Sequence, residues 1–238
     1  VNVRTGMNIQ PYDNVGATAI CRGNHLNAWK LGLWYNYTEN NTTAWQLTDN
    51  HITAAAIPTS LTPSTTWDGT VWTGIATQTL YANANGGSLN LNTVNGTGAT
   101  LPDTFGIQVR SSVPTPTNAL VFEGNTIESV DVGIHVGIRD TATYAGKVTL
   151  QNNNEVFNTE VAVLIDSPNN VAHTIIGNNI HDNVVGIKVR NGGKAIIEAN
   201  TLENNARQLA FEVTAADDSS VTVNGATYSP AAKSAAEL

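Results

Sequence analysis

The feature that most constrains this chain is a short unit that recurs along its length, at intervals of roughly 22 residues where it is most regular. Each unit has an asparagine that is followed two residues later by Leu, Ile or Val. In five units an apolar segment, such as Gly133-Ile-His-Val or Gly186-Ile-Lys-Val, begins eight residues after the asparagine. The unit of Asn50 lacks this spacing, and we assign Gly106-Ile-Gln-Val to it after an insertion. The recurring asparagines are Asn24, Asn50, Asn125, Asn154, Asn178 and Asn200.

Apolar and polar residues alternate over three or four positions within each segment, which is the period of a β-strand. Strands this short cannot enclose a core alone. Stacked coil upon coil, they form parallel sheets about 4.8 Å apart around one continuous core. The recurring asparagine then lies at the same corner of every coil, where its amide can bond to the asparagines above and below. The sequence therefore predicts an all-β solenoid in which these asparagines are structural.

Composition limits the classes of partner. Charged residues make up only 13% of the 238 residues and the net charge is −8, which argues against nucleic acid and against an anionic membrane surface. No apolar run approaches the length of a membrane span, so we expect no membrane insertion. The single cysteine excludes an intrachain disulfide. The low charge and abundant Asn and Thr favour an extracellular or cell-surface protein.

The units resemble those of the pectin-lyase-like and copper-protein-maturation-like β-helix superfamily. The resemblance rests on Phe122-Glu-Gly-Asn-Thr-Ile with Gly133-Ile-His-Val, and on Ile175-Ile-Gly-Asn-Asn-Ile with Gly186-Ile-Lys-Val. It covers roughly residues 1–52 and 103–225. It implies a single-stranded right-handed parallel β-helix of about seven coils. The superfamily includes polysaccharide lyases, epimerases and hydrolases, phage tailspikes and large surface proteins.

The repeat disappears between about residues 54 and 102, in a segment rich in Thr, Ala, Gly and Asn. We expect an inserted loop or β-arm within a β-helix domain that spans residues 1–225, with residues 226–238 as a tail or cap. Insertions in solenoids map to loops on one face, often the binding face. Trp67, Trp72 and Tyr81 lie in this segment. These aromatic residues would either form a platform for sugar rings or pack the arm against the β-helix.

The start of the chain resembles a coil that has already begun, because Gly6-Met-Asn-Ile matches the Gly-Ile-x-Val segment. An open solenoid end exposes core and unpaired backbone. We therefore expect additional β-helix coils, or a partner chain, at the N-terminal end.

The outward positions of the Gly-Ile-x-Val segments form two columns that together create one surface strip. Superfamily enzymes that resemble this fold hold their sites on such external faces. A lyase needs a base and a cation beside the sugar carboxylate. His135 or Lys188 would be the base, with Arg190 and Asp166 as further catalytic candidates, and Gln108 and Arg110 as glycan contacts. The alternative is a solvated face in which these charges pair across coils.

Other titratable residues carry weaker signals. His25 and His51 share a corner one coil apart and could bind a metal, but no third ligand is evident, so we predict polar corner residues. His173 is expected to point inward and bond to backbone, and Cys21 to lie in the core. We expect a solvated loop around His181. No resident cofactor is predicted, although the resemblance leaves room for Ca²⁺.

Three functions remain open. The first is an extracellular module that serves as a structural, adhesive or glycan-binding segment of a larger surface or secreted protein. The second is a carbohydrate-active enzyme that acts on an acidic polysaccharide through the strip around His135. The third is a segment of a phage fibre or tailspike. The missing Asp-Pro-His signature and the small number of coils favour the first.

Overall fold

The computed structural model describes residues 3–9, 19–37, 45–60, 71–79, 87–101, 103–109, 120–137, 147–166, 172–212 and 219–228. These residues are all-β, and none of them forms a helix that is long and apolar enough to cross a membrane. The strands are β1 (Val3–Ile9), β2 (Ala19–Arg22), β3 (His25–Tyr37), β4 (Trp45–Thr48), β5 (His51–Ala54), β6 (Val71–Thr79), β7 (Gly87–Asn90), β8 (Thr93–Asn95), β9 (Asp103–Val109), β10 (Leu120–Glu123), β11 (Thr126–Gly137), β12 (Val148–Gln151), β13 (Glu155–Asp166), β14 (His173–Ile176), β15 (Asn179–His181), β16 (Val185–Arg190), β17 (Lys194–Glu198), β18 (Thr201–Glu203), β19 (Arg207–Phe211), β20 (Ser220–Val223) and β21 (Ala226–Tyr228).

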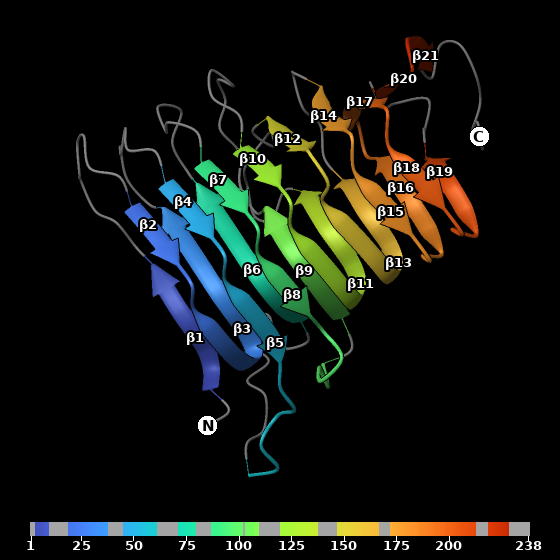
Figure 1. Ribbon diagram of the computed structural model, residues 1–238. Helices are drawn as coiled ribbons and strands as arrows, with labels where there is room; N and C mark the ends of the chain where they lie inside the picture. Colours follow the sequence, from blue (N-terminus) through green and yellow to red (C-terminus); the bar gives the residue numbers. More distant parts are fainter. Residues whose placement is uncertain are drawn as a thin grey trace.

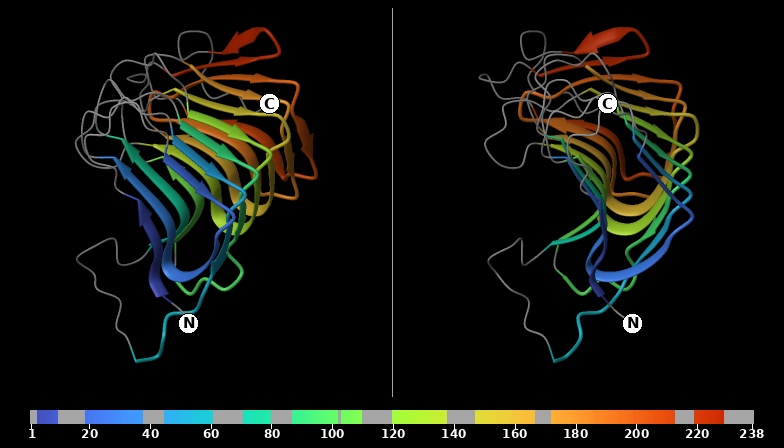
Figure 2. Two further views of the ribbon diagram at one scale, coloured as in Figure 1. Left: turned by 60° about the vertical axis from the view of Figure 1, so that its left-hand side comes forward. Right: turned by 90° about the vertical axis from the view of Figure 1, so that its left-hand side faces the viewer.

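The described strands, apart from the antiparallel β21, stack in parallel in two sheets along one axis (Figure 1). The long strands β3, β11 and β13 each pair with two successive shorter strands, so we divide the stack into three faces. Face 1 consists of β2, β4, β7, β10, β12, β14, β17 and β20. Face 2 consists of β5, β8, β15, β18 and the first halves of β3, β11 and β13. Face 3 consists of β1, β6, β9, β16, β19 and the second halves of the same three long strands. Figure 2 shows the successive coils lying one behind another.

The inward columns are apolar from coil to coil, as the alternation predicts. On face 3, Leu33, Ile75, Ile107 and Ile134 stand in register, and all four are fully buried. On face 1, Cys21 stands in register with Leu47 and is 7% exposed, so it is a core residue as predicted. Burial raises the pKa of its thiol. Such columns fill one continuous core because every coil repeats the same in–out pattern.

An asparagine ladder runs along the corner between faces 1 and 2, as the repeat predicts. In its middle, Asn125 Nδ2 donates to Asn154 Oδ1 at 2.8 Å and to the Leu89 carbonyl at 2.7 Å. Asn125 Oδ1 in turn accepts from the backbone N–H and the side-chain Nδ2 of Asn92, both at 3.0 Å. Each buried amide is therefore satisfied by its neighbouring coils. The ladder comprises Asn24, Asn50, Asn92, Asn125, Asn154, Asn178 and Asn200.

The recurring glycine of Gly-Ile-x-Val lies where the chain bends from face 2 into face 3. A Cβ on Gly133 would lie 2.5 Å from the Ala162 carbonyl oxygen and 2.4 Å from Val156 Cγ1. The backbone of the next coil cannot move away without breaking the hydrogen bonds between the paired strands, so this corner favours glycine. Ala162 holds the same column one coil later, which shows that the requirement relaxes locally.

The expected insertion over residues 54–102 is wrong for most of that segment. β6 pairs with β3 and β9, β7 pairs with β4 and β10, and β8 pairs with β5 and β11. These strands add a complete coil rather than an arm. Gly74-Ile-Ala-Thr is the face 3 strand that follows Asn50, and Gly106-Ile-Gln-Val belongs to the coil of Asn92. Residues 55–70 separate β5 from β6, a longer interval along the chain than in the regular coils, and this interval displaced the spacing and hid the coil.

The two ends of the described chain differ. Met7 of β1 pairs with Leu33 of β3, which confirms that Gly6-Met-Asn-Ile occupies the place of a Gly-Ile-x-Val strand. At the other end β21 folds back antiparallel on β20, through a turn in which Asn224 and Gly225 both have positive φ. The remaining tail, residues 229–238, lies outside the described residues.

Candidate functional site

The predicted strip lies on the outer side of face 3, where strand register confirms its two columns. In the first, Gln108 pairs with His135, His135 with Leu164, and Leu164 with Lys188. In the second, Gly137 pairs with Asp166 and Asp166 with Arg190. The register brings His135, Asp166 and Arg190 together as expected. It also inserts Ala76 between Trp34 and Gln108, which the missed coil had hidden.

Asp166 is the centre of this cluster. Its Oδ2 accepts from Arg190 Nη2 at 2.6 Å and its Oδ1 from Asn191 Nδ2 at 2.5 Å. Burial alone would raise the pKa of Asp166. The nearby His135 imidazole, the hydrogen bonds from Arg190 and Asn191, and the charge of Arg190 together outweigh burial and hold the pKa of Asp166 well below its usual range. Asp166 is therefore a fixed carboxylate, which does not suit a role as a general acid.

His135 is held on both sides. Gln108 Nε2 lies 3.1 Å from His135 Nδ1, and an amide nitrogen can only donate, so Nδ1 accepts and Nε2 carries the proton. Nε2 then faces Asp166 Oδ2 at 3.7 Å, and this nitrogen is closed to solvent. The Phe105 ring lies 5.2 Å from the imidazole. A Cβ on Gly137 would meet Nε2 at 2.5 Å, so glycine leaves the space that the ring occupies.

Lys188 is also engaged. Its ammonium lies 2.5 Å from Glu212 Oε1, with the lysine side chain 20% exposed and the glutamate 56% exposed. A base must be neutral and must reach the sugar proton, whereas this ammonium is bonded to a carboxylate. Together with the Arg190–Asp166 pair, this contact matches the expected alternative in which charges of opposite sign pair across coils.

The predicted glycan contacts fare differently. Trp72 is fully buried, and its Nε1 donates to the Ala28 carbonyl at 2.9 Å, so the prediction of an exposed sugar platform is wrong for this residue. Its strand lies in the stack, where the indole faces the core. Gln108 is 5% exposed and supports His135, so it is not a surface contact. Trp67, Tyr81 and Arg110 lie outside the described residues.

Two histidine clusters lie on face 2. The His25 and His51 rings stack at 4.7 Å with an angle of 7° between them, which confirms that they share a corner. Asp49 Oδ1 lies 3.8 Å from His51 Nε2. Nevertheless, no group of three His, Cys, Asp or Glu side chains in the described part of the chain is arranged to hold a metal ion.

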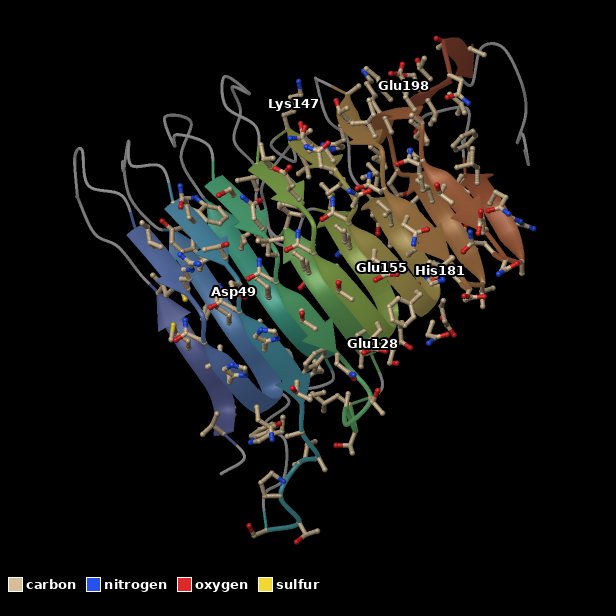
Figure 3. All side chains as sticks on the ribbon, viewed as in Figure 1. Asp49, Glu128, Lys147, Glu155, His181 and Glu198 are labelled. Carbon is tan, nitrogen blue, oxygen red and sulfur yellow. The ribbon has the colours of Figure 1, made fainter. Side chains whose placement is uncertain are left out.

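His181 was expected in a solvated loop but makes specific contacts that the sequence did not indicate. Its Nδ1 lies 2.7 Å from Asp182 Oδ2. Its Nε2 lies 3.3 Å from Oε1 of Glu155, which is labelled beside it in Figure 3. Hydrogen bonding to Asp182, and secondarily to Glu155, raises the pKa of His181 despite its partial burial. The ring stacks on Phe157 at 5.2 Å. The outward alternation along face 2 is the signal that could have placed these side chains together.

Comparison with known proteins gives one match. A family model described as a right-handed β-helix region matches residues 105–236, which is more than half of the chain. Neither a curated protein nor a solved structure matches significantly. The parallel stack of short strands around one axis agrees with this description. The chain belongs to the right-handed β-helix family.

Proposed function

We propose that this chain is a non-catalytic β-helix module of the cell exterior, which serves a structural or glycan-binding role within a larger surface or secreted protein. One observation carries the proposal. The charged side chains that a sugar-processing site would need are bonded to one another across coils, Arg190 to Asp166 at 2.6 Å and Lys188 to Glu212 at 2.5 Å.

The state of His135 supports the same conclusion. A general base must come within hydrogen-bond reach of the proton that it removes. His135 Nδ1 is used by Gln108, and its Nε2 is closed to solvent and directed at Asp166. A substrate would have to displace one of these partners before the imidazole could act.

The outer side of face 3 still offers a surface for a glycan. Phe105, Val132, Val161 and Val185 form an adjoining outward column, each only partly buried. The Phe105 ring borders His135. Apolar and aromatic surface beside a few fixed polar groups is the usual composition of a sugar-sized ligand site. The polysaccharide would lie along this column, parallel to the stack.

The test is a screen of soluble acidic and neutral polysaccharides, with and without Ca²⁺, at several pH values. Absorbance of unsaturated uronates reports lyase turnover, reducing ends report hydrolysis, and calorimetry reports binding. We expect binding without turnover, lost in Phe105→Ala and kept in Phe157→Ala, which removes the corresponding ring from face 2. Binding that survives Phe105→Ala would show that the glycan binds elsewhere than this column, and no binding to any polysaccharide would leave only the structural role.

A carbohydrate-active enzyme is the second candidate, because both the His135 imidazole and the Arg190 guanidinium lie against the Asp166 carboxylate. A carboxylate, an imidazole and a guanidinium could stabilise charge on a uronate. Turnover that disappears in His135→Ala but persists in His25→Ala would establish this candidate and overturn the non-catalytic proposal.

A further inference from the structure

The outer side of face 1 has a charge pattern that the proposed function does not use. Its three outward columns differ in character. The first column contains Lys147, Ala172, Lys194 and Ser220 in its described part. The third column contains Gln151, Ile176, Glu198 and Asn224 in the same coils, and Glu123 in the coil before them. Cations therefore border one side of this half of the face and carboxylates the other. Figure 3 shows Lys147 and Glu198 beside the strands of this face. The exception among the described charges of the face is Arg22, in the first coil.

The middle column is uncharged over all eight strands. Most of its members are β-branched or bear a hydroxyl, and they range from partly buried to exposed, with Ile20 at 62%. The column consists of Ile20, Gln46, Ser88, Val121, Thr149, Thr174, Ile196 and Thr222. Uncharged side chains of this kind pack well when two sheets meet face to face.

We propose that face 1 is the interface of a homodimer, in which two copies pack face to face around a twofold axis that runs parallel to the stack. Such an axis keeps each coil opposite the same coil of the second copy and reverses the strand direction. Lys194 then faces Glu198 of the second copy, and Glu198 faces its Lys194. Lys147 lies one coil from Glu123 of the second copy. An isologous interface requires this kind of self-complementarity.

The charges also exclude the other face-to-face arrangement. A twofold axis parallel to the strands would place the lysine border of one copy on the lysine border of the other, and carboxylates on carboxylates. Like charges in such positions repel each other, so they disfavour this second orientation of the dimer. The occupant of the face is thus a second copy in one orientation.

The size of face 1 limits how tightly the two copies can bind to each other. Eight strands about 4.8 Å apart give a length of roughly 34 Å, and three outward columns give a width of roughly 17 Å. Each copy would then bury about 600 Å², or about 1,200 Å² for the pair, which is at the lower end of specific interfaces. We expect a dissociation constant in the micromolar range.

Sedimentation velocity between about 1 µM and 1 mM tests the proposal, and far-UV circular dichroism confirms that each variant is folded. Wild-type protein should pass from monomer to dimer. Lys194→Glu places carboxylate on carboxylate at both symmetric contacts, and Glu198→Lys places ammonium on ammonium. Each variant alone should dimerise at least about tenfold more weakly. An equimolar mixture of the two should recover wild-type association, because the opposite charges face one another again.

Glu203→Lys on face 2 is the matched control and should dimerise as the wild type does. A wild type that stays monomeric throughout the range would overturn the proposal. So would Lys194→Glu and Glu198→Lys variants that dimerise as strongly as the wild type, or a mixture that associates no better than its components. The mixture also shows that the single variants retained a competent surface, so loss of folding cannot imitate the expected result.

Discussion

His173 makes the stability of this protein depend on pH in a way that can be worked out from its surroundings. The side chain is 1% exposed and stands in the core of face 1, with its Nδ1 accepting from the Val148 N–H at 3.1 Å. This confirms the expected inward orientation and bond to backbone. Its Nε2 has no hydrogen-bond partner among the described residues. Burial, and secondarily the charge of Lys147, lowers the pKa of His173 to about 4.

The direction in which stability changes with pH follows from the number of protons bound by the folded and unfolded states. Below its ordinary pKa of 6.5 the unfolded chain protonates this histidine, while the folded protein keeps it neutral until about pH 4. The unfolded state therefore binds more protons, and stability falls as pH decreases through this window by up to about 1.4 kcal/mol per pH unit. At pH 4.5 the accumulated loss from His173 is about 2.5 kcal/mol.

The assay compares wild type with His173→Asn, whose Oδ1 can still accept the Val148 N–H but cannot titrate. Urea unfolding, followed by tryptophan fluorescence, gives the free energy of unfolding at pH 7.5 and 4.5. The variant is expected to lose stability at pH 7.5 through poorer packing, yet to lose about 2.5 kcal/mol less than wild type on going to pH 4.5. His25→Asn, at an exposed position, serves as the control. Equal losses in wild type and His173→Asn would refute the argument.

Three further substitutions test the fold and the strip. Asn125→Ala should lower the free energy of unfolding by about 3 kcal/mol or more, because it leaves buried hydrogen-bonding groups on both neighbouring coils without partners. Asn200 is partly exposed, so Asn200→Ala should lower it by about 1 kcal/mol. Similar losses for the two variants in denaturant unfolding would contradict the role given to the ladder. Gly133→Val should lower the melting temperature by about 10 °C, since its side chain meets backbone; a change within about 2 °C would show that the corner can relax. Arg190→Ala should lower the free energy of unfolding by about 1–2 kcal/mol at pH 7 and by less near pH 3. Arg190 stabilises the ionised Asp166, and this stabilisation is lost as the pH falls through the range where the carboxylate takes up its proton. A loss that does not depend on pH would contradict this reasoning.

The asparagine spacing was sufficient to predict the coil, its inward columns and the function of the ladder, because each coil repeats the same local pattern. It also predicted the register of the face 3 strip, including the adjacency of Asp166 and Arg190. The same reasoning failed at Asn92, although Val94 follows it two residues later as the pattern requires. Lengthened corners around this coil broke the offset of eight residues that the regular coils share.

The solvent exposure of side chains was harder to predict. Trp72 lies in a Thr-rich segment whose pattern also suits a surface hairpin, and only its pairing with β3 and β9 turns the indole inward. His135 occupies an outward position by alternation, yet its neighbours in adjacent coils occupy one nitrogen and close off the other. The alternation of apolar and polar residues predicts on which side of a strand a side chain lies, but it does not predict which residues of other coils contact that side chain.

The sequence by itself determined that this chain forms a parallel β-helix, since short alternating strands with a fixed asparagine corner can bury their apolar side only by stacking. The tertiary structure decided which residues face one another between coils. It pairs the strip's cations with carboxylates, Arg190 with Asp166 and Lys188 with Glu212, and it brings Glu155 against His181. These contacts join residues about one coil apart or more, so they depend on the length of every intervening corner. Corner lengths vary along this chain, and only the assembled stack shows which strands they bring into register.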